Sequence, residues 1–373
     1  MSISKIIYFN RSSIHYRKEI YLALENELDT DFYFGDKRPG KIKELDINLL
    51  KNFRGYLHNI VFKEPIYWQR GALSLAFKPY DVYITPGEAT CLSTWLLAVL
   101  CRLKGKKVYF WSHGCHGVQK GFRGFVTKLH FALASGGFLY GEYAKECLTK
   151  MGCNPSKLHV IYNSLSYDEQ NAVIATNPIS DIYIKHFGNS DPVLVFIGRL
   201  IKSKRIEMLI NATASLLSSG QSVNCVIVGD GECRQSLQEL VIEKNIANRV
   251  WFYGPSYDEH NNAELLSNAA LCVSPGEVGL TAIHSLTYGT PVITHNNYYK
   301  QGPEFEAITE EVTGSFYEYE NDNSLTAAIK KWLPRCINER EQIRKYCRKV
   351  VDEKYNPHYQ ISVIKKAINY GID

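Results

Sequence analysis

Residues 274–293 read Ser-Pro-Gly-Glu-Val-Gly-Leu-Thr-Ala-Ile-His-Ser-Leu-Thr-Tyr-Gly-Thr-Pro-Val-Ile. The apolar run that ends at Ser274 predicts a buried strand, and the loop after it carries Gly276 and Gly279. A helix is expected over Leu280–Tyr288, and another strand follows it. A strand, a glycine loop and a helix in this order form an anion site, because the first N–H groups of a helix have no partner within it and its dipole favours negative charge.

The same alternation of short β-rich runs and longer helical stretches continues outward along the chain. Strands are expected at 5–9, 31–34, 81–85, 106–112, 136–140, 158–162, 193–197, 223–228, 250–253, 270–273 and 291–294. Helices are expected at 16–26, 91–103, 122–134, 204–218, 232–244 and 280–288. Because several of these strands are apolar throughout, they predict parallel sheets covered by helices on both faces. The expected fold is therefore α/β, with two Rossmann-like doubly wound domains that face each other across a cleft.

The break in this alternation gives the expected domain boundaries. Polar residues with Asn177-Pro178 and a Gly-Asn-Ser run at 188–190 indicate a linker. The boundaries that follow are a first domain at 1–168, a linker at 169–191, a second domain at 192–355, and a C-terminal helix at 356–373 that packs back on the first domain.

Two further segments place charges and glycines at predicted strand ends. Residues 196–205 read Phe-Ile-Gly-Arg-Leu-Ile-Lys-Ser-Lys-Arg, so Arg199 follows a strand and Lys204 stands at a helix start. A guanidinium fork and a lysine that converge there would bind a diphosphate. Residues 226–232 read Val-Ile-Val-Gly-Asp-Gly-Glu and lack the third glycine of a full dinucleotide motif.

These segments, in this order and spacing, resemble the second domain of family-4-type glycosyltransferases (glycosyl transferases group 1), which are retaining enzymes of the GT-B fold. The resemblance covers about residues 192–335 and includes Phe-Tyr-Gly at 252–254 and Gly-Thr-Pro-Val-Ile at 289–293. In the first domain, Trp-Ser-His-Gly at 111–114 and Val-Ile-Tyr-Asn at 160–163 are similar to family motifs.

The resemblance implies the site residues. His113 would lie over the transferred sugar as a catalytic residue, and the donor's diphosphate would be held by Arg199, Lys204 and the N–H groups around Gly279–Thr281. The implied donor-binding residues are Gly198, Arg199, Lys204, Gly229, Gly254, Gly279, Leu280, Thr281 and His284. The acceptor contacts expected in the first domain are His15, Arg17 and His116. The segment 10–17 takes the place of the family's glycine-rich first loop.

The chain departs from the family where a pair of glutamates separated by seven residues is expected. Gly276 and His284 occupy those two positions. Glu277 is one place off, and it is the candidate catalytic carboxylate beside the donor sugar. His284 is expected to accept a hydrogen bond from the donor ribose through a neutral ring nitrogen, in place of the family's second glutamate.

Composition bounds the partners. The chain has 373 residues, of which 45% are hydrophobic and 22% charged, which excludes a disordered or collagen-like protein. Residues 1–170 hold 23 Lys and Arg against 15 Asp and Glu, which is a net charge of +8, whereas the whole chain has a net charge of +5. Residues 89–141 hold seven basic and no acidic residues, which is typical of a surface for an anionic partner or of a solvated basic face. A peripheral contact with anionic membrane is expected, and nucleic acid is not.

Ten scattered cysteines without a Cys-x-x-Cys pair, together with the lack of a secretory signal pattern, predict reduced thiols and a cytoplasmic protein. The basic stretch adds the expectation of a contact with the inner face of the cell membrane. No metal or other cofactor is expected. Asp29-Thr-Asp31 mimics a metal-binding Asp-x-Asp motif, but it precedes a strand and is interpreted as a surface turn.

The predicted function is transfer of a sugar from a UDP-, GDP- or other nucleoside diphosphate sugar to a glycan or lipid-linked acceptor hydroxyl, with retention and without a metal, in surface polysaccharide or glycan assembly. Two alternatives stay open. One is a nucleotide-sugar 2-epimerase of the same architecture, and the other is a non-catalytic sugar-binding protein.

Overall fold

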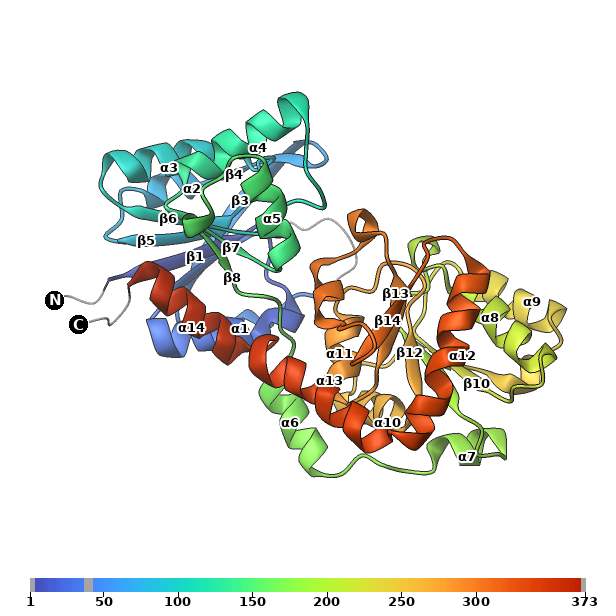
Figure 1. Cartoon of the computed structure of the whole chain (residues 1–373). Coiled ribbons are helices and arrows are strands. Elements are labelled where there is room, and N and C mark those ends of the chain that lie inside the picture. The colour runs from blue at the N-terminus through green and yellow to red at the C-terminus, as the bar shows by residue number, and fades with distance from the viewer. Residues whose placement is uncertain (1–3, 37–42, 370–373) are drawn as a thin grey trace. The chain divides into compact units, whose positions relative to one another are not determined.

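The computed structural model describes residues 4–36 and 43–369 (Figure 1). The chain divides into two compact units, one made of Met1–Ser166 with Asn356–Asp373 and the other of Tyr167–Tyr355. The second unit is therefore inserted between two parts of the first. The ends of the expected first domain and C-terminal helix, residues 1–3 and 370–373, lie outside the described residues.

In the described part of the chain, the first unit contains a sheet of eight strands in the order β4-β3-β2-β1-β5-β6-β7-β8. Neighbouring strands are parallel except for the antiparallel hairpin of β3 and β4. The strands are β1 (Ile6–Asn10), β2 (Asp31–Gly35), β3 (Phe53–Lys63), β4 (Ile66–Arg70), β5 (Val82–Pro86), β6 (Lys107–Ser112), β7 (Gly136–Leu139) and β8 (Leu158–Val160). The helices are α1 (Lys18–Leu28), α2 (Ala72–Leu75), α3 (Leu92–Leu103), α4 (Gly121–Leu133), α5 (Glu142–Lys150) and α14 (Pro357–Ile368).

The second unit contains a fully parallel sheet in the order β11-β10-β9-β12-β13-β14. Its strands are β9 (Val193–Ile197), β10 (Asn224–Val228), β11 (Val250–Gly254), β12 (Leu271–Val273), β13 (Val292–His295) and β14 (Gly314–Tyr317). Its helices are α6 (Tyr167–Ala175), α7 (Ile182–Phe187), α8 (Ile206–Ser218), α9 (Arg234–Glu243), α10 (Glu259–Asn268), α11 (Thr281–Thr287), α12 (Asp322–Asn338) and α13 (Arg340–Lys354). The strand order reverses between β9 and β12, and ligands of such sheets bind at the carboxyl ends of the strands at that point.

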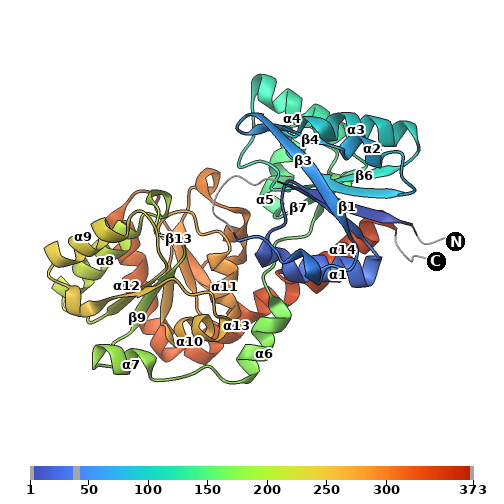
Figure 2. The ribbon, with the colours of Figure 1, turned by 180° about the vertical axis from the view of Figure 1, so that it is seen from behind.

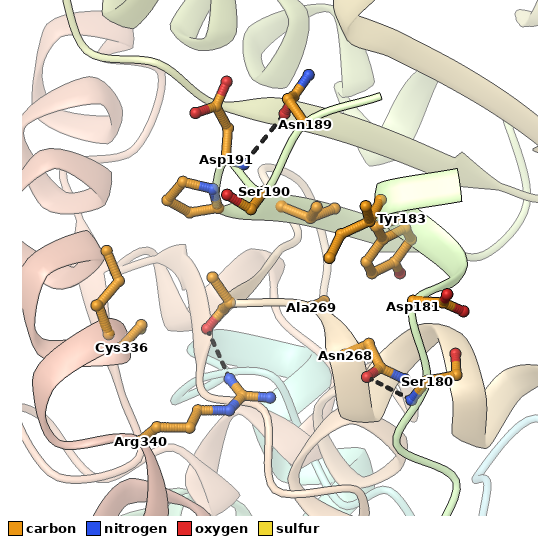
Figure 3. A pocket seen from close by; sticks show the side chains of 15 residues that line it. Ser180, Asp181, Tyr183, Asn189, Ser190, Asp191, Asn268, Ala269, Cys336 and Arg340 are labelled. Atoms are coloured by element: carbon orange, nitrogen blue, oxygen red, sulfur yellow. Dashed lines mark hydrogen bonds between the residues drawn. The ribbon is translucent and has the colours of Figure 1, made fainter. Parts of the chain in front are cut away.

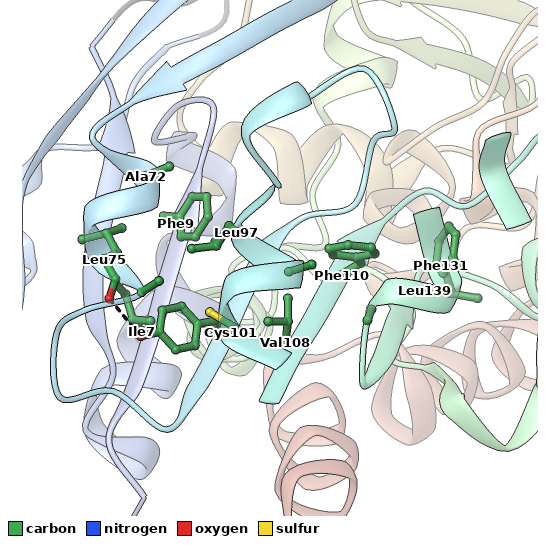
Figure 4. Packing of buried hydrophobic residues seen from close by; sticks show 14 of the residues in the cluster. Ile7, Phe9, Ala72, Leu75, Leu97, Cys101, Val108, Phe110, Phe131 and Leu139 are labelled. Atoms are coloured by element: carbon green, nitrogen blue, oxygen red, sulfur yellow. Dashed lines mark hydrogen bonds between the residues drawn. The ribbon is translucent and has the colours of Figure 1, made fainter. Parts of the chain in front are cut away.

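Both faces of the first unit's sheet are covered by helices. On one face α2, α3 and α4 pack on Ile7, Phe9 and Phe110 (Figure 4). On the other face α1 and α14 pack on Tyr8 and Phe32, and the view from behind shows this pair of helices together (Figure 2). The expected α/β class with two Rossmann-like units is thus confirmed.

Residues 169–191 differ from the linker expected for them. They include most of α6 and all of α7, and both helices belong to the second unit. Tyr183 of α7 is buried, and its hydroxyl donates to the carbonyl oxygen of Leu265, 2.6 Å away. On α6, Val173 is buried as well. These buried side chains dock two short helices on the second unit, so the segment is part of that unit and not a free linker.

The C-terminal helix α14 belongs to the first unit. Ile361, Ile364 and Ile368 are buried there in the cluster that also contains Leu24 of α1. Gln360 donates to the carbonyl oxygen of Tyr162 at 2.8 Å and accepts from the hydroxyl of Ser164 at 2.7 Å.

The part of the chain that the structure describes has no helix with the length and hydropathy needed to cross a lipid bilayer.

Candidate functional site

Three glycines line the carboxyl ends of adjacent strands in the second unit. The amide of Gly198, after β9, donates to the carbonyl oxygen of Val228 at 2.9 Å. The amide of Gly229, after β10, donates to the carbonyl oxygen of Gly254 at 2.8 Å. A Cβ at Gly229 would lie 1.9 Å from the carbonyl oxygen of Gly198, so no larger residue fits without moving this loop. The predicted donor residues Gly198, Gly229 and Gly254 are therefore brought together as a closely packed edge.

Lys204 lies beside the loop that follows β12. It ends the short helix η4 (Lys202–Lys204), and its Nζ donates to the carbonyl oxygen of Glu277 at 2.5 Å. The amide of Gly276 donates back to the carbonyl oxygen of Lys204 at 3.0 Å. A Cβ at Gly276 would lie 2.1 Å from the carbonyl oxygen of Ser203, so this close approach requires glycine. The two loops predicted from separate motifs are thus held in direct contact.

The start of α11 presents unpaired amides next to this lysine. Among the described residues, no protein acceptor receives a hydrogen bond from the N–H groups of Gly279, Leu280 or Thr281. Gly279 has a φ of +53°, and a Cβ there would be 4.0 Å from Lys204 Nζ. The Thr281 hydroxyl donates to the carbonyl oxygen of Ile197 at 2.9 Å, which ties α11 to the end of β9. An ammonium and three backbone donors are together suited to phosphate oxygens.

The charges around Lys204 are mixed. Burial lowers the pKa of Lys204 and the nearby Arg199 cation lowers it further, while the carboxylates of Glu277 and Glu304 act in the opposite direction. Arg199 and Glu277 are exposed. The side chains of Glu277 and Glu304 both approach Gly302.

Sequence reasoning missed Glu304 and its neighbour Gln301, both of which are buried. Gln301 accepts from the amide of Val278 at 2.9 Å and donates to the hydroxyl of Thr294 at 2.9 Å, so it fixes the glycine loop to β13. Their place in the sequence was the available signal. The predicted strand at 291–294 ends at the same edge of the sheet, and residues that follow the carboxyl end of such a strand are expected to line the ligand site.

His284 is placed by a carboxylate that sequence reasoning also missed. Its Nε2 lies 2.9 Å from Glu259 Oε1, which also accepts from the Tyr288 hydroxyl at 2.7 Å and from Gln170 Nε2 at 2.9 Å. Burial by itself raises the pKa of Glu259, but the charge attraction of His284 and the hydrogen bonds from His284, Tyr288 and Gln170 outweigh it and lower the pKa to about 2. If Nε2 of a neutral His284 carries the proton toward Glu259, Nδ1 is left as a hydrogen-bond acceptor.

In the first unit, His113 directly follows β6. Its ring lies 4.8 Å from that of Tyr140, whose hydroxyl accepts from the guanidinium of Arg17. His113 is open to solvent. Its pKa is nevertheless lowered to about 4, because the surrounding protein restricts its hydration and the Arg17 cation and His116 lie nearby. The ring is therefore neutral near pH 7.

The expected acceptor residues do not form one cluster of solvent-exposed side chains. Arg17 is buried and its guanidinium also donates to the Tyr8 hydroxyl at 3.4 Å, so it supports Tyr140 rather than facing solvent. His15 is held by the carbonyl oxygen of Lys43, 3.0 Å from its Nδ1. His116 is exposed and lies near enough to His113 to lower its pKa.

A cavity of about 320 Å³ in the second unit lies elsewhere (Figure 3). It is lined by Asp191 and Pro192 before β9 and by Ala269 and Ala270 before β12, which places it at the amino ends of the strands. Its arginine, Arg340, donates to the backbone carbonyl oxygens of Ala270 at 3.3 Å and Ser267 at 2.7 Å. This cavity is therefore separate from the site at the carboxyl ends.

Part of the sequence, including the carboxyl edge just described, matches a known family model. Residues 182–350 match the family model described as glycosyl transferases group 1. The resemblance inferred from the sequence motifs is thereby confirmed, and the matched range contains all the predicted donor-binding residues.

Curated relatives of this family match over part of their length. An uncharacterized glycosyltransferase of Methanocaldococcus jannaschii is 28% identical over 45% of this chain and 42% of its own. A GDP-mannose-dependent phosphatidylinositol dimannoside mannosyltransferase of Mycobacterium tuberculosis is 35% identical over 27% of this chain and 26% of its own. An alpha-monoglucosyldiacylglycerol synthase of Streptococcus pneumoniae is 29% identical over 39% of this chain and 32% of its own. The chain thus spans less than half the length of these relatives.

Solved structures of glycosyltransferases share the whole fold. Anabaena HepE in complex with UDP has a TM-score of 0.71 and 14% identity, with 98% of this chain and 99% of that chain covered. The lipopolysaccharide outer core galactosyltransferase WaaB has a TM-score of 0.70 and 16% identity over the same shares. The fold is therefore GT-B, as the motifs implied.

Proposed function

We propose that this chain is a glycosyltransferase that moves a sugar from a nucleoside diphosphate sugar to an acceptor hydroxyl. The observation that carries the proposal is that Lys204 Nζ lies beside the glycine loop near Gly279, where α11 begins with the unpaired amides of Gly279, Leu280 and Thr281 at the switch point of the second unit. Arg199 adds a second cation at the same strand end. HepE, which shares this fold, was solved in complex with UDP, and that complex supports a diphosphate ligand here.

The chemistry follows from where charge develops. As the glycosidic bond to the diphosphate breaks, negative charge grows on the leaving phosphate oxygen. Fixed cations and amides stabilise that charge more than they stabilise the intact donor, so they lower the barrier. No step in this scheme uses a metal ion or another cofactor, and we propose that the transfer is metal-independent and retaining.

His113 and Glu277 complete the proposed machinery. A neutral imidazole at His113 offers one donor and one acceptor for the hydroxyls of the transferred sugar. Glu277 lies at the Lys204 loop and is proposed as the carboxylate beside that sugar, with Glu304 as a buried neighbour. Nδ1 of His284 is proposed to accept from a ribose hydroxyl.

The acceptor is proposed to be a glycan or a lipid-linked molecule. Two curated relatives have glycolipids in their names, a phosphatidylinositol dimannoside mannosyltransferase and an alpha-monoglucosyldiacylglycerol synthase, which supports a lipid-linked acceptor here. The positive balance of residues 1–170 is compatible with a phosphate-bearing acceptor held by the first unit.

The test uses the full chain with a panel of UDP-, GDP- and dTDP-sugars. A ligand bound by the folded state raises the melting temperature by mass action, so the matching donor identifies itself. Product analysis with that donor then separates the candidates. A transferred sugar supports the proposal, an isomerised free nucleotide sugar indicates an epimerase, and bound sugar without turnover indicates a binding protein. No stabilisation by any nucleotide sugar would contradict both the transferase and the epimerase.

A further inference from the structure

Helix α3 is apolar on the side that faces away from the sheet. Leu97, Ala98 and Cys101 are buried in the core. On the opposite side Leu92, Leu96, Val99 and Leu103 are exposed, with exposed fractions of 40%, 50%, 39% and 79%. Their spacing of four, three and four residues places them in one row along the helix. A helix that is apolar all round is normally buried, so the outer row is suited to a further apolar environment.

Helix α4 continues the same surface. Phe122, Phe125 and Leu129 are exposed at 80%, 61% and 45% and are spaced three and four residues apart. Figures 1 and 2 show α3 and α4 side by side on one face of the first unit's sheet. These two helices hold 25 residues, yet they carry seven of the 23 exposed large hydrophobic side chains among the described residues. We call these seven side chains the α3–α4 face.

Cations surround the α3–α4 face. The exposed side chains of Arg102, Lys104, Lys120, Arg123 and Lys128 lie on or next to the two helices. Residues 89–141 themselves contain no Asp or Glu. An apolar row bordered by positive charge is the composition of a helix that lies in the interface of an anionic bilayer.

A basic pocket lies at the carboxyl ends of the same helices. It has a volume of about 380 Å³, and its lining includes Ala98 and Arg102 of α3 and Leu133 of α4. Arg102, Lys106, Lys107 and Lys157 supply four cations, and no carboxylate lines it. Lys106 already donates to two backbone carbonyl oxygens and to the Tyr83 hydroxyl. Arg102 and Lys107 each donate to one backbone carbonyl oxygen, that of Ala132 at 3.3 Å and that of Ile368 at 3.5 Å. A phosphate group in this pocket would be attracted by their remaining donors and by Lys157.

We propose that the α3–α4 face docks on a bilayer that contains anionic phospholipid. Its apolar side chains enter the boundary between head groups and acyl chains, and the basic pocket receives a lipid phosphate. A second copy of the chain fits less well, because two such faces would bring their cations together without carboxylates between them. Membrane binding itself does not depend on the proposed function. Only its usefulness rests on that function, because docking would bring the enzyme close to a lipid-linked acceptor.

The experiment measures sedimentation of the full chain with vesicles of phosphatidylglycerol and phosphatidylcholine, without any nucleotide sugar. The wild type is expected to bind mixed anionic vesicles and to leave pure phosphatidylcholine largely unbound. Phe122→Ser with Phe125→Ser is expected to lower the partition coefficient at least tenfold, because burial of one phenylalanine is worth about that factor. Leu96→Ser with Leu103→Ser tests α3 in the same way. Arg102→Gln with Lys157→Gln is expected to remove about fivefold per charge, on anionic vesicles only.

The matched control is Tyr257→Ser with Ile242→Ser, two exposed apolar side chains of the second unit. It should bind as the wild type does. All the replaced residues are exposed, and an unchanged melting temperature verifies that each variant is folded. The proposal is overturned if both apolar double variants bind like the wild type, if neutral and anionic vesicles bind equally, or if the wild type is a dimer that the Phe122 and Phe125 changes make monomeric. Donor stabilisation is measured separately, so loss of docking leaves the proposed activity testable.

Discussion

Lys204 is a half-buried cation with a second cation nearby. Its ammonium is bonded to a single backbone carbonyl oxygen, that of Glu277, and Arg199 is close enough to disfavour its charge. Two cations held together at a site with unpaired amides repel each other. A diphosphate would relieve that repulsion and satisfy the amides at once, so affinity for an anion is built into the fold at this residue.

We expect Lys204→Ala to weaken UDP binding by about 10–150-fold, since a charge-assisted hydrogen bond is worth about 1.5–3 kcal/mol. Arg199→Ala should fall in the same range. Lys202→Ala is the control, because Lys202 belongs to the same short helix but is exposed. Titration calorimetry with UDP measures all three. Equal losses in Lys202→Ala and Lys204→Ala would show a general charge effect rather than a specific contact.

Glu259 is expected to stabilise the second unit in a pH-dependent way. Its pKa is about 2 in the folded protein, below the usual value, so the stabilisation is fully present above about pH 5 and is lost as the pH falls toward 2. Glu259→Gln should therefore lower the free energy of unfolding at pH 7 by on the order of 2 kcal/mol. In urea unfolding, the difference from the wild type should shrink below about pH 4.5. Glu232→Gln, at an exposed carboxylate, should show no such trend.

His113→Ala should reduce turnover far more than UDP affinity, because His113 lies in the first unit whereas the phosphate donors lie in the second. With its pKa lowered to about 4, the ring stays neutral from pH 5 to pH 8. The pH profile of wild-type turnover should therefore contain no inflection near pH 6.5 that is caused by His113. Such an inflection, lost in the variant, would mean that the protonated ring takes part.

At the scale of elements, the site depends on loops that pack without side chains between them. Gly276→Ala would push a Cβ against the carbonyl oxygen of Ser203 and force η4 away from the loop after β12. We expect a loss of about 1–3 kcal/mol in stability together with weaker UDP binding. Gly105→Ala, in an open turn of the first unit with a φ of +68°, should cost only the left-handed backbone strain of about 1–2 kcal/mol. Its UDP affinity should be unchanged, and calorimetry checks both variants.

Most helices and strands could be predicted because hydrophobic residues recur in them with one clear period. Strand β9 is found at the predicted residues 193–197, and α3 begins one residue after the predicted start. The hairpin of β3 and β4 was missed, because aromatic, polar and charged residues alternate along it and most of its side chains are exposed. Strand β14 was missed as well, since its four residues give too short a pattern.

The glycines at strand ends and Lys204 at a helix start stand out in the sequence pattern. The full set of donor residues is implied by the resemblance to the family and stays a prediction. Glu259 could not be predicted in this way, because it reaches the site from another element through a side-chain contact. Gln301 and Glu304 follow a predicted strand, but no motif marks them. Residues that are far apart in the sequence give no local pattern that would reveal such a contact. Glu259 is 25 residues from its partner His284 and precedes another strand.

At the scale of the whole molecule, the chain leaves the first unit at Ser166 and returns to it at Asn356. Helix α14 then completes the core of the first unit, with Ile364 fully buried beside Leu24. The first unit therefore cannot finish folding until the second has been synthesised. This order makes the stability of the first unit depend on residues almost at the end of the chain.

Ile364→Ala should thus destabilise the first unit locally, by about 2–5 kcal/mol, because it leaves a cavity in a closely packed cluster. Hydrogen exchange should become faster in α1, β1 and α14 and remain unchanged in the second unit. Ile329→Ala, at an equally buried position of α12, should give the reverse pattern. UDP binding should survive in Ile364→Ala, since every proposed phosphate contact lies in the other unit. If instead both variants accelerate exchange throughout the chain, the two units unfold as one cooperative body, and the division seen in the structure has no counterpart in stability.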